Sequence, residues 1–133
     1  LHIPFFAKTD AFVKKLYNQK ELEAYVESPI SYRWLEWENY KDVTPYTFFN
    51  YYIQMIETEM NVEMLNTMSE HFIKSGIKGK PILYTYDSVL FDVHKDHKNL
   101  LMYEIIPASI DLYKFPVKMK SGNNYANLDF CAT

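Results

Sequence analysis

The sequence predicts an α+β fold in which an antiparallel β-hairpin, or a small sheet, packs against one long α-helix. The helix is indicated by residues 46–75, which contain neither proline nor glycine. The hairpin is indicated by two apolar, β-prone runs, residues 81–86 and 89–93, on either side of the polar dipeptide Asp87-Ser88. Only 3 glycines in a chain that is 48% hydrophobic favour regular, packed structure over a flexible chain.

The long helix has recognisable ends and a side that should face the core. Thr44 is a good N-cap, Pro45 suits the first helical position and Gly76 is a natural stop. Apolar residues recur along the helix at three- and four-residue spacing, which predicts a buried stripe. The predicted stripe comprises Phe49, Ile53, Ile56, Met60, Met64 and Met68.

Shorter elements are expected before this helix. Residues 9–18 have the apolar spacing of a short amphipathic helix. Residues 24–28 and 32–37 are rich in β-branched and aromatic side chains on either side of Pro29, which predicts a hairpin-like pair of short strands. Residues 36–42 are polar and are expected to form a loop.

The C-terminal third should mix helix and strand. Lys78–Lys80 is expected to form a turn, and residues 98–113 have a helical pattern that Pro107 should kink or split. Residues 115–120 alternate apolar and basic side chains, as a half-exposed strand does, and residues 121–124 carry a turn signal.

Composition limits the classes of protein to consider. At 133 residues the chain has the size of one domain, and its net charge of −3 gives it no general basic character of the kind that binds nucleic acid. Cys131 is the only cysteine, so no internal disulfide can form, and a reducing, cytoplasmic compartment fits (the host cytoplasm if the source is viral). No apolar run approaches the roughly 20 residues of a membrane span, so no membrane partner is expected. The start at Leu1 rather than Met suggests a fragment or a processed product.

Asp87 is the first candidate for chemistry. A carboxylate at a tight hairpin tip is exposed and held in place, which suits binding of a hard cation such as Mg²⁺. The alternative is that aspartate is simply a common turn residue, and spacing alone favours this second interpretation. One carboxylate does not make a two-metal site.

The segment around Asp87 resembles motif C of family A, phage-type DNA polymerases. It reads Leu83-Tyr-Thr-Tyr-Asp-Ser-Val-Leu-Phe-Asp92, with the family's order of apolar strand, aspartate and apolar strand. Where the family usually has His-Asp-Glu, this chain has Tyr86-Asp87-Ser88. The resemblance implies that Asp87 is a catalytic residue and a Mg²⁺ ligand, with Tyr86 and Ser88 as secondary candidates. Asp92 lies too far along the strand to replace the missing glutamate.

The long helix and two further segments resemble the same family in the same order. Asn50-Tyr-Tyr-Ile-Gln54 is similar to its Asn-x-x-x-Gln, which implies that Asn50 and Gln54 monitor the primer–template DNA. The family's usual arginine upstream of this motif falls at Tyr46. Residues 24–33 resemble its Gly-Tyr-Val-Glu-Thr…Gly-Arg-Arg segment, and the surviving Arg33 would contact a phosphate. Residues 115–125 look like the last strand and turn of phage polymerases, so the resemblance covers roughly residues 9–128.

The resemblance implies that residues 1–133 are the C-terminal part of a polymerase palm domain. The implied activity is DNA-directed nucleotidyl transfer from a deoxynucleoside triphosphate (dNTP) to a primer 3′-hydroxyl during DNA replication, with two Mg²⁺ ions. The fingers and the motif A aspartate are expected before Leu1, so the remainder of the polymerase chain is a required partner and this portion should be inactive alone. The alternative is a non-enzymatic α+β module that binds another protein, which the lack of a basic face favours.

Other polar groups are expected to be structural. His94 and His97 lie near Asp92 and Asp96, but the neighbouring lysines favour an exposed loop over a metal site. The glutamates of the long helix are expected to form its solvated face; they are Glu57, Glu59, Glu63 and Glu70.

Overall fold

The computed structural model describes residues 3–85, 87–111, 113–114 and 116–131, and it confirms the α+β class. Its sheets are three antiparallel two-stranded pairs in the described residues. The chain divides into two compact units, Leu1–Asn61 and Val62–Thr133, and the long helix α2 (Pro45–Ser75) contributes to both. No helix in the described part of the chain is long and apolar enough to cross a membrane.

The predicted ends of α2 are confirmed. The Oγ1 of Thr44 accepts a hydrogen bond from the backbone amide of Thr47 at 3.2 Å, which satisfies one of the free amides of the first turn. Pro45 is the first helical residue. Gly76 follows the last helical residue with φ +62°, a conformation that glycine adopts without the steric cost of a Cβ.

We expect Thr44→Ala to lower the free energy of unfolding by about 1 kcal/mol, because the first turn of α2 loses its cap. Urea denaturation measures this change. Thr58→Ala is a matched control, since the Thr58 hydroxyl donates back to the carbonyl of Gln54 within the exposed helix and caps nothing. An equal loss in both variants would contradict the capping role of Thr44.

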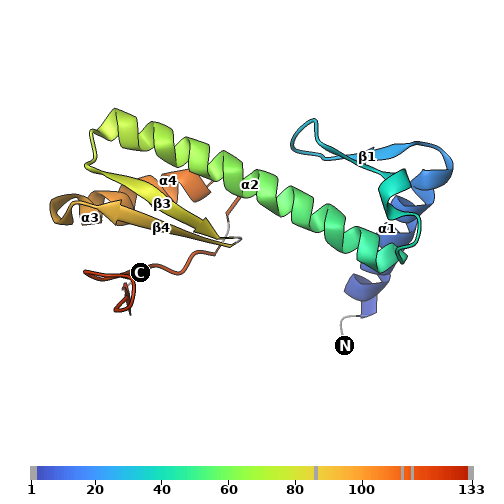
Figure 1. Ribbon diagram of the computed structural model, residues 1–133. Coiled ribbons are helices and arrows are strands. Elements are labelled where there is room, and N and C mark those ends of the chain that lie inside the picture. The colour runs from blue at the N-terminus through green and yellow to red at the C-terminus, as the bar shows by residue number, and fades with distance from the viewer. Residues whose placement is uncertain (1–2, 86, 112, 115, 132–133) are drawn as a thin grey trace. The chain divides into compact units, whose positions relative to one another are not determined.

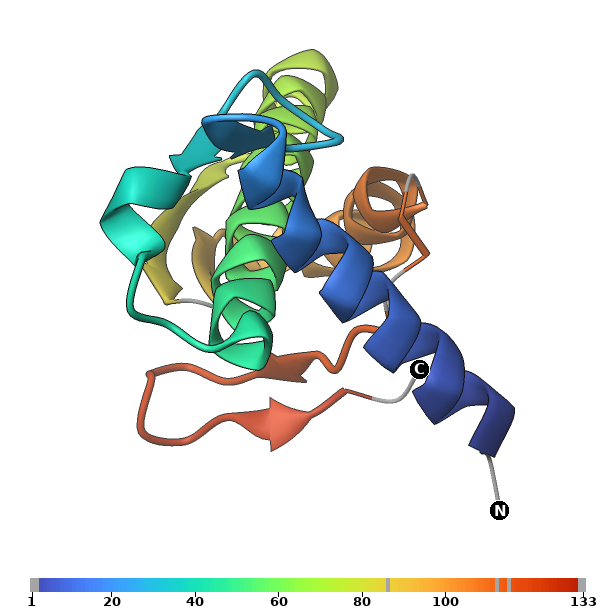
Figure 2. The ribbon, with the colours of Figure 1, turned by 90° about the vertical axis from the view of Figure 1, so that its right-hand side faces the viewer.

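The first unit is built on the N-terminal half of α2 (Figures 1 and 2). Its other elements are α1 (Ile3–Asn18), η1 (Gln19–Glu21), β1 (Tyr25–Glu27), β2 (Trp34–Glu36) and η2 (Trp37–Tyr40). The two predicted short strands are confirmed, with Val26 opposite Leu35 in an antiparallel pair. The core of the unit consists of Leu16, Val26, Trp37, Phe48, Tyr52 and Met55.

The prediction of a polar loop at residues 36–42 is wrong. Most of it is the short 3-10 helix η2, and Trp37 within it is buried. The Trp37 ring stacks on Phe48 with ring centroids 3.9 Å apart. A single large aromatic ring can bury enough apolar surface to order an otherwise polar segment.

The predicted buried stripe of α2 is displaced by one position in the first unit. The residues buried there are Phe48, Tyr52, Met55 and Glu59, whereas Ile53 is 42% exposed. Phe49, Ile56, Met60 and Met64 are half-buried, and Met68 is buried as predicted. Because apolar residues occur on several sides of this helix, its spacing alone could not identify the side that faces the core.

The second unit combines the C-terminal half of α2 with a β-hairpin and a helical segment (Figure 1). Its elements after α2 are β3 (Gly79–Thr85), β4 (Ser88–Val93), η3 (Lys95–His97), α3 (Lys98–Leu100), η4 (Leu101–Ile105), α4 (Ile106–Ile110), β5 (Lys120–Ser121) and β6 (Asp129–Phe130). Its core consists of Met68, Phe72, Ile77, Leu101, Ile105 and Ile106. Phe91 of β4 stacks on Phe72 of α2, which joins the hairpin to the helix.

The predicted hairpin is confirmed, with two differences at its ends. β3 already begins at Gly79, inside the predicted turn, where a Cβ would lie 2.7 Å from the carbonyl oxygen of Asp92. At the other end Ser88 pairs with Thr85, so Ser88 belongs to β4 and not to the connecting turn. The register shifts between Pro81 and Leu83, where the proline has no amide to donate.

The helical segment after the hairpin runs from Lys98 to Ile110 and is shorter than predicted. The helix does not break at Pro107. It widens instead into the π-helical segment η4, which ends two residues before this proline. In an α-helix the proline ring would meet the carbonyl four residues earlier, and a wider turn relieves that clash.

The predicted strand at residues 115–120 is wrong for most of its length. Phe115 lies outside the described residues, and β5 covers only Lys120–Ser121, which pair with Phe130 and Asp129 of β6. Strand structure needs a hydrogen-bonded neighbour, and this one reaches only the end of the predicted segment. The predicted turn at residues 121–124 is confirmed in outline, because it opens the connection between β5 and β6.

Candidate functional site

Asp87 lies in the turn that connects β3 to β4, and it is exposed. The turn is closed beside it, where the hydroxyls of Thr85 and Ser88 lie 2.6 Å apart and the Ser88 Oγ also approaches the carbonyl of Thr85 at 3.3 Å. Ser88 therefore holds the base of the turn. Tyr86, the other neighbour of Asp87, lies outside the described residues.

The Asp87 carboxylate could supply one oxygen ligand to a hard cation, but the cation would need further ligands from other groups. In the described residues no group of three or more His, Cys, Asp or Glu side chains is placed to hold a metal ion. Asp92 stands opposite Lys80, four residues further along β4 than Ser88, which agrees with the expectation that it cannot substitute for a second tip carboxylate. Mg²⁺ commonly uses one or two protein carboxylates together with substrate phosphates, so Asp87 fits part of such a site.

The two histidines after β4 have structural roles in the described chain. The Nδ1 of His97 accepts a hydrogen bond from the backbone amide of Lys78 at 2.8 Å. The Nδ1 of His94 accepts a longer one, at 3.4 Å, from the amide of Asp96. Both rings thus accept hydrogen bonds from nearby backbone amides. The segment that was expected to be an exposed loop contains the short 3-10 helix η3, in which His97 is half-buried while His94 before it is exposed.

Asn50 and Gln54 lie one turn apart on the N-terminal half of α2, and both are exposed. Residues four apart on a helix share a face, so the two amides can contact one partner together. Tyr46, which occupies the place of the family's arginine, contacts α1 instead. Its hydroxyl donates a hydrogen bond to Asp10, and the Nζ of Lys14 lies 2.7 Å from the same carboxylate. Hydrogen bonds from Lys14 and then Tyr46 lower the pKa of Asp10.

Arg33 is the last residue of the β1–β2 loop, and its side chain is 62% exposed. Its Nε lies 3.9 Å from Oε1 of Glu59. The prediction that Glu59 belongs to the solvated face of α2 is wrong, because this residue is buried to 7% exposure. Glu57, Glu63 and Glu70 are exposed as predicted.

Glu59 is the functional-site candidate that the sequence interpretation missed. Its carboxylate accepts hydrogen bonds from the hydroxyls of Ser28 and Ser31, the latter at 2.8 Å. Burial, and after it the charge of Glu59, raises the pKa of the neighbouring Tyr52. Glu59 lies four residues after Met55, so the correct register of the buried stripe would have placed it on the inner side of the helix.

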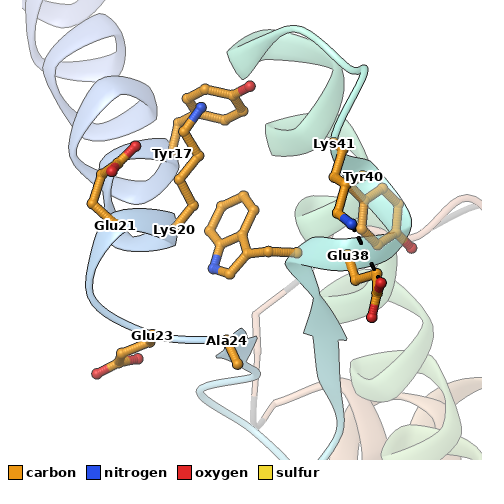
Figure 3. A pocket seen from close by; sticks show the side chains of 9 residues that line it. Tyr17, Lys20, Glu21, Glu23, Ala24, Glu38, Tyr40 and Lys41 are labelled. Atoms are coloured by element: carbon orange, nitrogen blue, oxygen red, sulfur yellow. Dashed lines mark hydrogen bonds and ion pairs between the residues drawn. The ribbon is translucent and has the colours of Figure 1, made fainter.

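A cavity of about 540 Å³ opens in the first unit between α1 and η2 (Figure 3). Lys20 stands over the Tyr17 ring on one side, and Lys41 reaches Glu38 at 3.3 Å on the other. Its remaining lining residues are Glu21, Glu23, Ala24, Trp37 and Tyr40. Three of the lining residues carry a carboxylate and two an ammonium group, so this cavity is poorly suited to a nucleoside triphosphate.

The predicted site residues fall into both units. Arg33, Asn50 and Gln54 belong to the first unit, together with Glu59, whereas Asp87 and Ser88 belong to the second. Within the first unit the structure brings Arg33 to Glu59, a pairing that no sequence pattern indicated.

No protein-family profile, curated protein sequence or solved structure matches this chain.

Proposed function

We propose that this chain is the C-terminal part of the palm of a family A, phage-type DNA polymerase. The observation that carries the proposal is the placement of Asp87, an exposed carboxylate in the tight turn of an antiparallel hairpin that follows a long helix. That order of elements, and the aspartate within it, agree with the motif C resemblance. The activity would be transfer of a nucleotide from a dNTP to a primer 3′-hydroxyl.

Asp87 would act as one protein ligand to Mg²⁺. Bound Mg²⁺ would neutralise charge on the phosphates and on the attacking and leaving oxygens. The role of this chain is to hold one carboxylate in a fixed position, and the closure of the turn by Thr85 and Ser88 supports that role. The partner carboxylate and the residues that hold the incoming dNTP would come from the remainder of the polymerase chain.

Asn50, Gln54 and Arg33 would hold the primer–template DNA. Amide side chains both donate and accept hydrogen bonds, which suits the minor-groove acceptors that all base pairs share. The exposed guanidinium of Arg33 suits a phosphate. The net charge of −3 means that these few contacts, and not a general basic surface, would have to provide the attraction.

A second candidate function is that of a non-enzymatic interaction module. The observation that favours it is the exposure of apolar residues on β3, namely Ile82, Leu83 and Tyr84. A two-stranded hairpin with exposed apolar side chains offers a surface and edges to another polypeptide. In a polymerase that polypeptide would be a strand of the same chain, whereas in an interaction module it would be a different protein.

We expect the purified 133-residue chain to bind Mg²⁺ weakly and not to extend a primer, because it provides one metal carboxylate. The decisive comparison is with the same chain expressed together with whatever open reading frame continues upstream of Leu1. Template-dependent incorporation by the longer protein alone would support the proposal. Incorporation by the 133-residue chain would show that the active site is misplaced, and a start codon directly before Leu1 would favour the interaction module.

A further inference from the structure

The β1–β2 loop of the first unit is organised by one buried carboxylate. The oxygens of Glu59 accept from the hydroxyls of Ser28 and Ser31, which lie on either side of the loop centre. These hydroxyl oxygens in turn accept from backbone amides of the loop. The Ser28 Oγ accepts from the amide of Ile30 at 3.1 Å, and the Ser31 Oγ accepts from the amide of Arg33 at 3.1 Å.

This network holds the backbone at Arg33 and places its side chain beside Glu59. The carbonyl of Arg33 accepts from the amide of Ser28 at 2.8 Å, which closes the loop. The amide of Arg33 is held by Ser31, and its Nε faces Glu59 at 3.9 Å. Arg33 is the only arginine in the sequence. Most of the Arg33 side chain is accessible to a ligand, since it is 62% exposed.

A charged group is costly to bury unless hydrogen bonds and an opposite charge compensate it. Within the described residues, the hydrogen bonds and the opposite charge that compensate the buried carboxylate of Glu59 come from the short loop that carries Arg33. An arginine that is already oriented loses less conformational entropy when it binds a phosphate, because its fork of N–H donors is presented in one direction.

We propose that Glu59 is a positioning residue, which holds Arg33 in the orientation that contacts a phosphate of the DNA backbone. This inference rests on the proposed function, because it takes the ligand of Arg33 to be primer–template DNA. Glu59 itself would not touch the DNA. It acts through the Ser28 and Ser31 hydroxyls and through its ion pair with Arg33.

The test compares two variants that change the charge of α2 equally. Glu59→Gln and Glu57→Gln each remove one negative charge, and Glu57 is exposed two residues away. Loss of a negative charge should by itself strengthen DNA binding or leave it unchanged. If Glu59 positions Arg33, Glu59→Gln weakens binding of a primer–template duplex roughly 10-fold, which is opposite in sign to the charge effect.

Further measurements test whether the weaker DNA binding of Glu59→Gln is caused by a change at Arg33. A phosphate contact contributes about 0.9 to the slope of log affinity against log salt concentration, so the slope should fall by that amount in Glu59→Gln and in Arg33→Ala. In the Arg33→Ala background, Glu59→Gln should cause no further weakening. The Arg33 Nε–H resonance, the single arginine signal in the ¹H–¹⁵N spectrum, should shift in Glu59→Gln and not in Glu57→Gln.

Several results would overturn this inference. If Glu59→Gln folds and binds DNA as Glu57→Gln does, the positioning role is wrong while the proposed function stands. Equal binding by the unsubstituted chain and Arg33→Ala would show that Arg33 does not contact a DNA phosphate. Absence of duplex binding by the longer protein, expressed with the reading frame upstream of Leu1, would contradict the proposed function as well. If Glu59→Gln does not fold, Ser31→Ala takes its place: a smaller weakening with a shifted Arg33 signal supports the inference, and unchanged values overturn it.

Discussion

Asp87→Asn is expected to lower the single-turnover rate of nucleotide incorporation by the polymerase that contains this chain by roughly two to three orders of magnitude. The substitution nearly preserves the shape of the side chain and removes its charge, so the metal loses an anionic ligand while the turn is retained. Binding of the primer–template should survive. Rapid-quench incorporation with saturating DNA and dNTP separates the chemical step from binding.

Two matched variants show whether the loss is specific to Asp87. Ser88→Ala removes hydrogen bonds that close the turn, each worth about 0.5–1.5 kcal/mol, and so should reduce incorporation only mildly. Gln54→Ala should also have a modest effect, felt mainly in extension or mismatch discrimination. If Ser88→Ala proves as damaging as Asp87→Asn, the metal-ligand assignment fails and the hairpin needs another explanation.

Phe48→Ala is expected to lower the free energy of unfolding by about 3–5 kcal/mol. Phe48 is fully buried at 0% exposure, and its ring contacts Tyr17, Trp37 and Tyr40 at the centre of the first unit. Removal of the ring leaves a cavity and unstacks Trp37. A loss of that size is a large fraction of the roughly 5–15 kcal/mol that stabilises a typical domain.

The control for Phe48 is Ile53→Ala, a position that the apolar spacing of the sequence had placed in the buried stripe. Ile53 is 42% exposed, so its truncation should cost well under half as much as that of Phe48. Chemical denaturation of both variants, followed by tryptophan fluorescence, measures the difference. A larger cost at Ile53 would mean that the side of α2 facing the core has been assigned incorrectly.

Local features determined the ends of the elements. The cap at Thr44 and the positive φ of Gly76 depend on side chains within one turn of the helix ends, so they could be predicted from the residues themselves. The β3–β4 hairpin could be predicted for the same reason, because two β-prone runs are joined by a very short turn. The exposed position of Asp87 follows from that turn.

The side of α2 that faces inward is set by contacts with segments distant in the sequence. Phe48 and Phe49, like Met55 and Ile56, are adjacent apolar residues that point in different directions, so the spacing fits more than one stripe. In the structure Trp37 stacks on Phe48, so the stripe that contains Phe48 is the one that faces the core. That choice brings Glu59 to the inner side, where Ser28, Ser31 and Arg33 meet it from a loop about 30 residues away in sequence.

Local sequence patterns were therefore sufficient to predict the α+β class, the long capped helix, the two hairpins and an exposed aspartate at a turn. Each depends on interactions between residues that are close in the chain. The burial of Trp37 and Glu59 depends on contacts between distant segments, and the energy of such contacts is set by packing that no single segment encodes. A glutamate on a helix is ordinarily solvated, and in this structure two hydroxyls and a guanidinium offset part of the desolvation cost of burying Glu59.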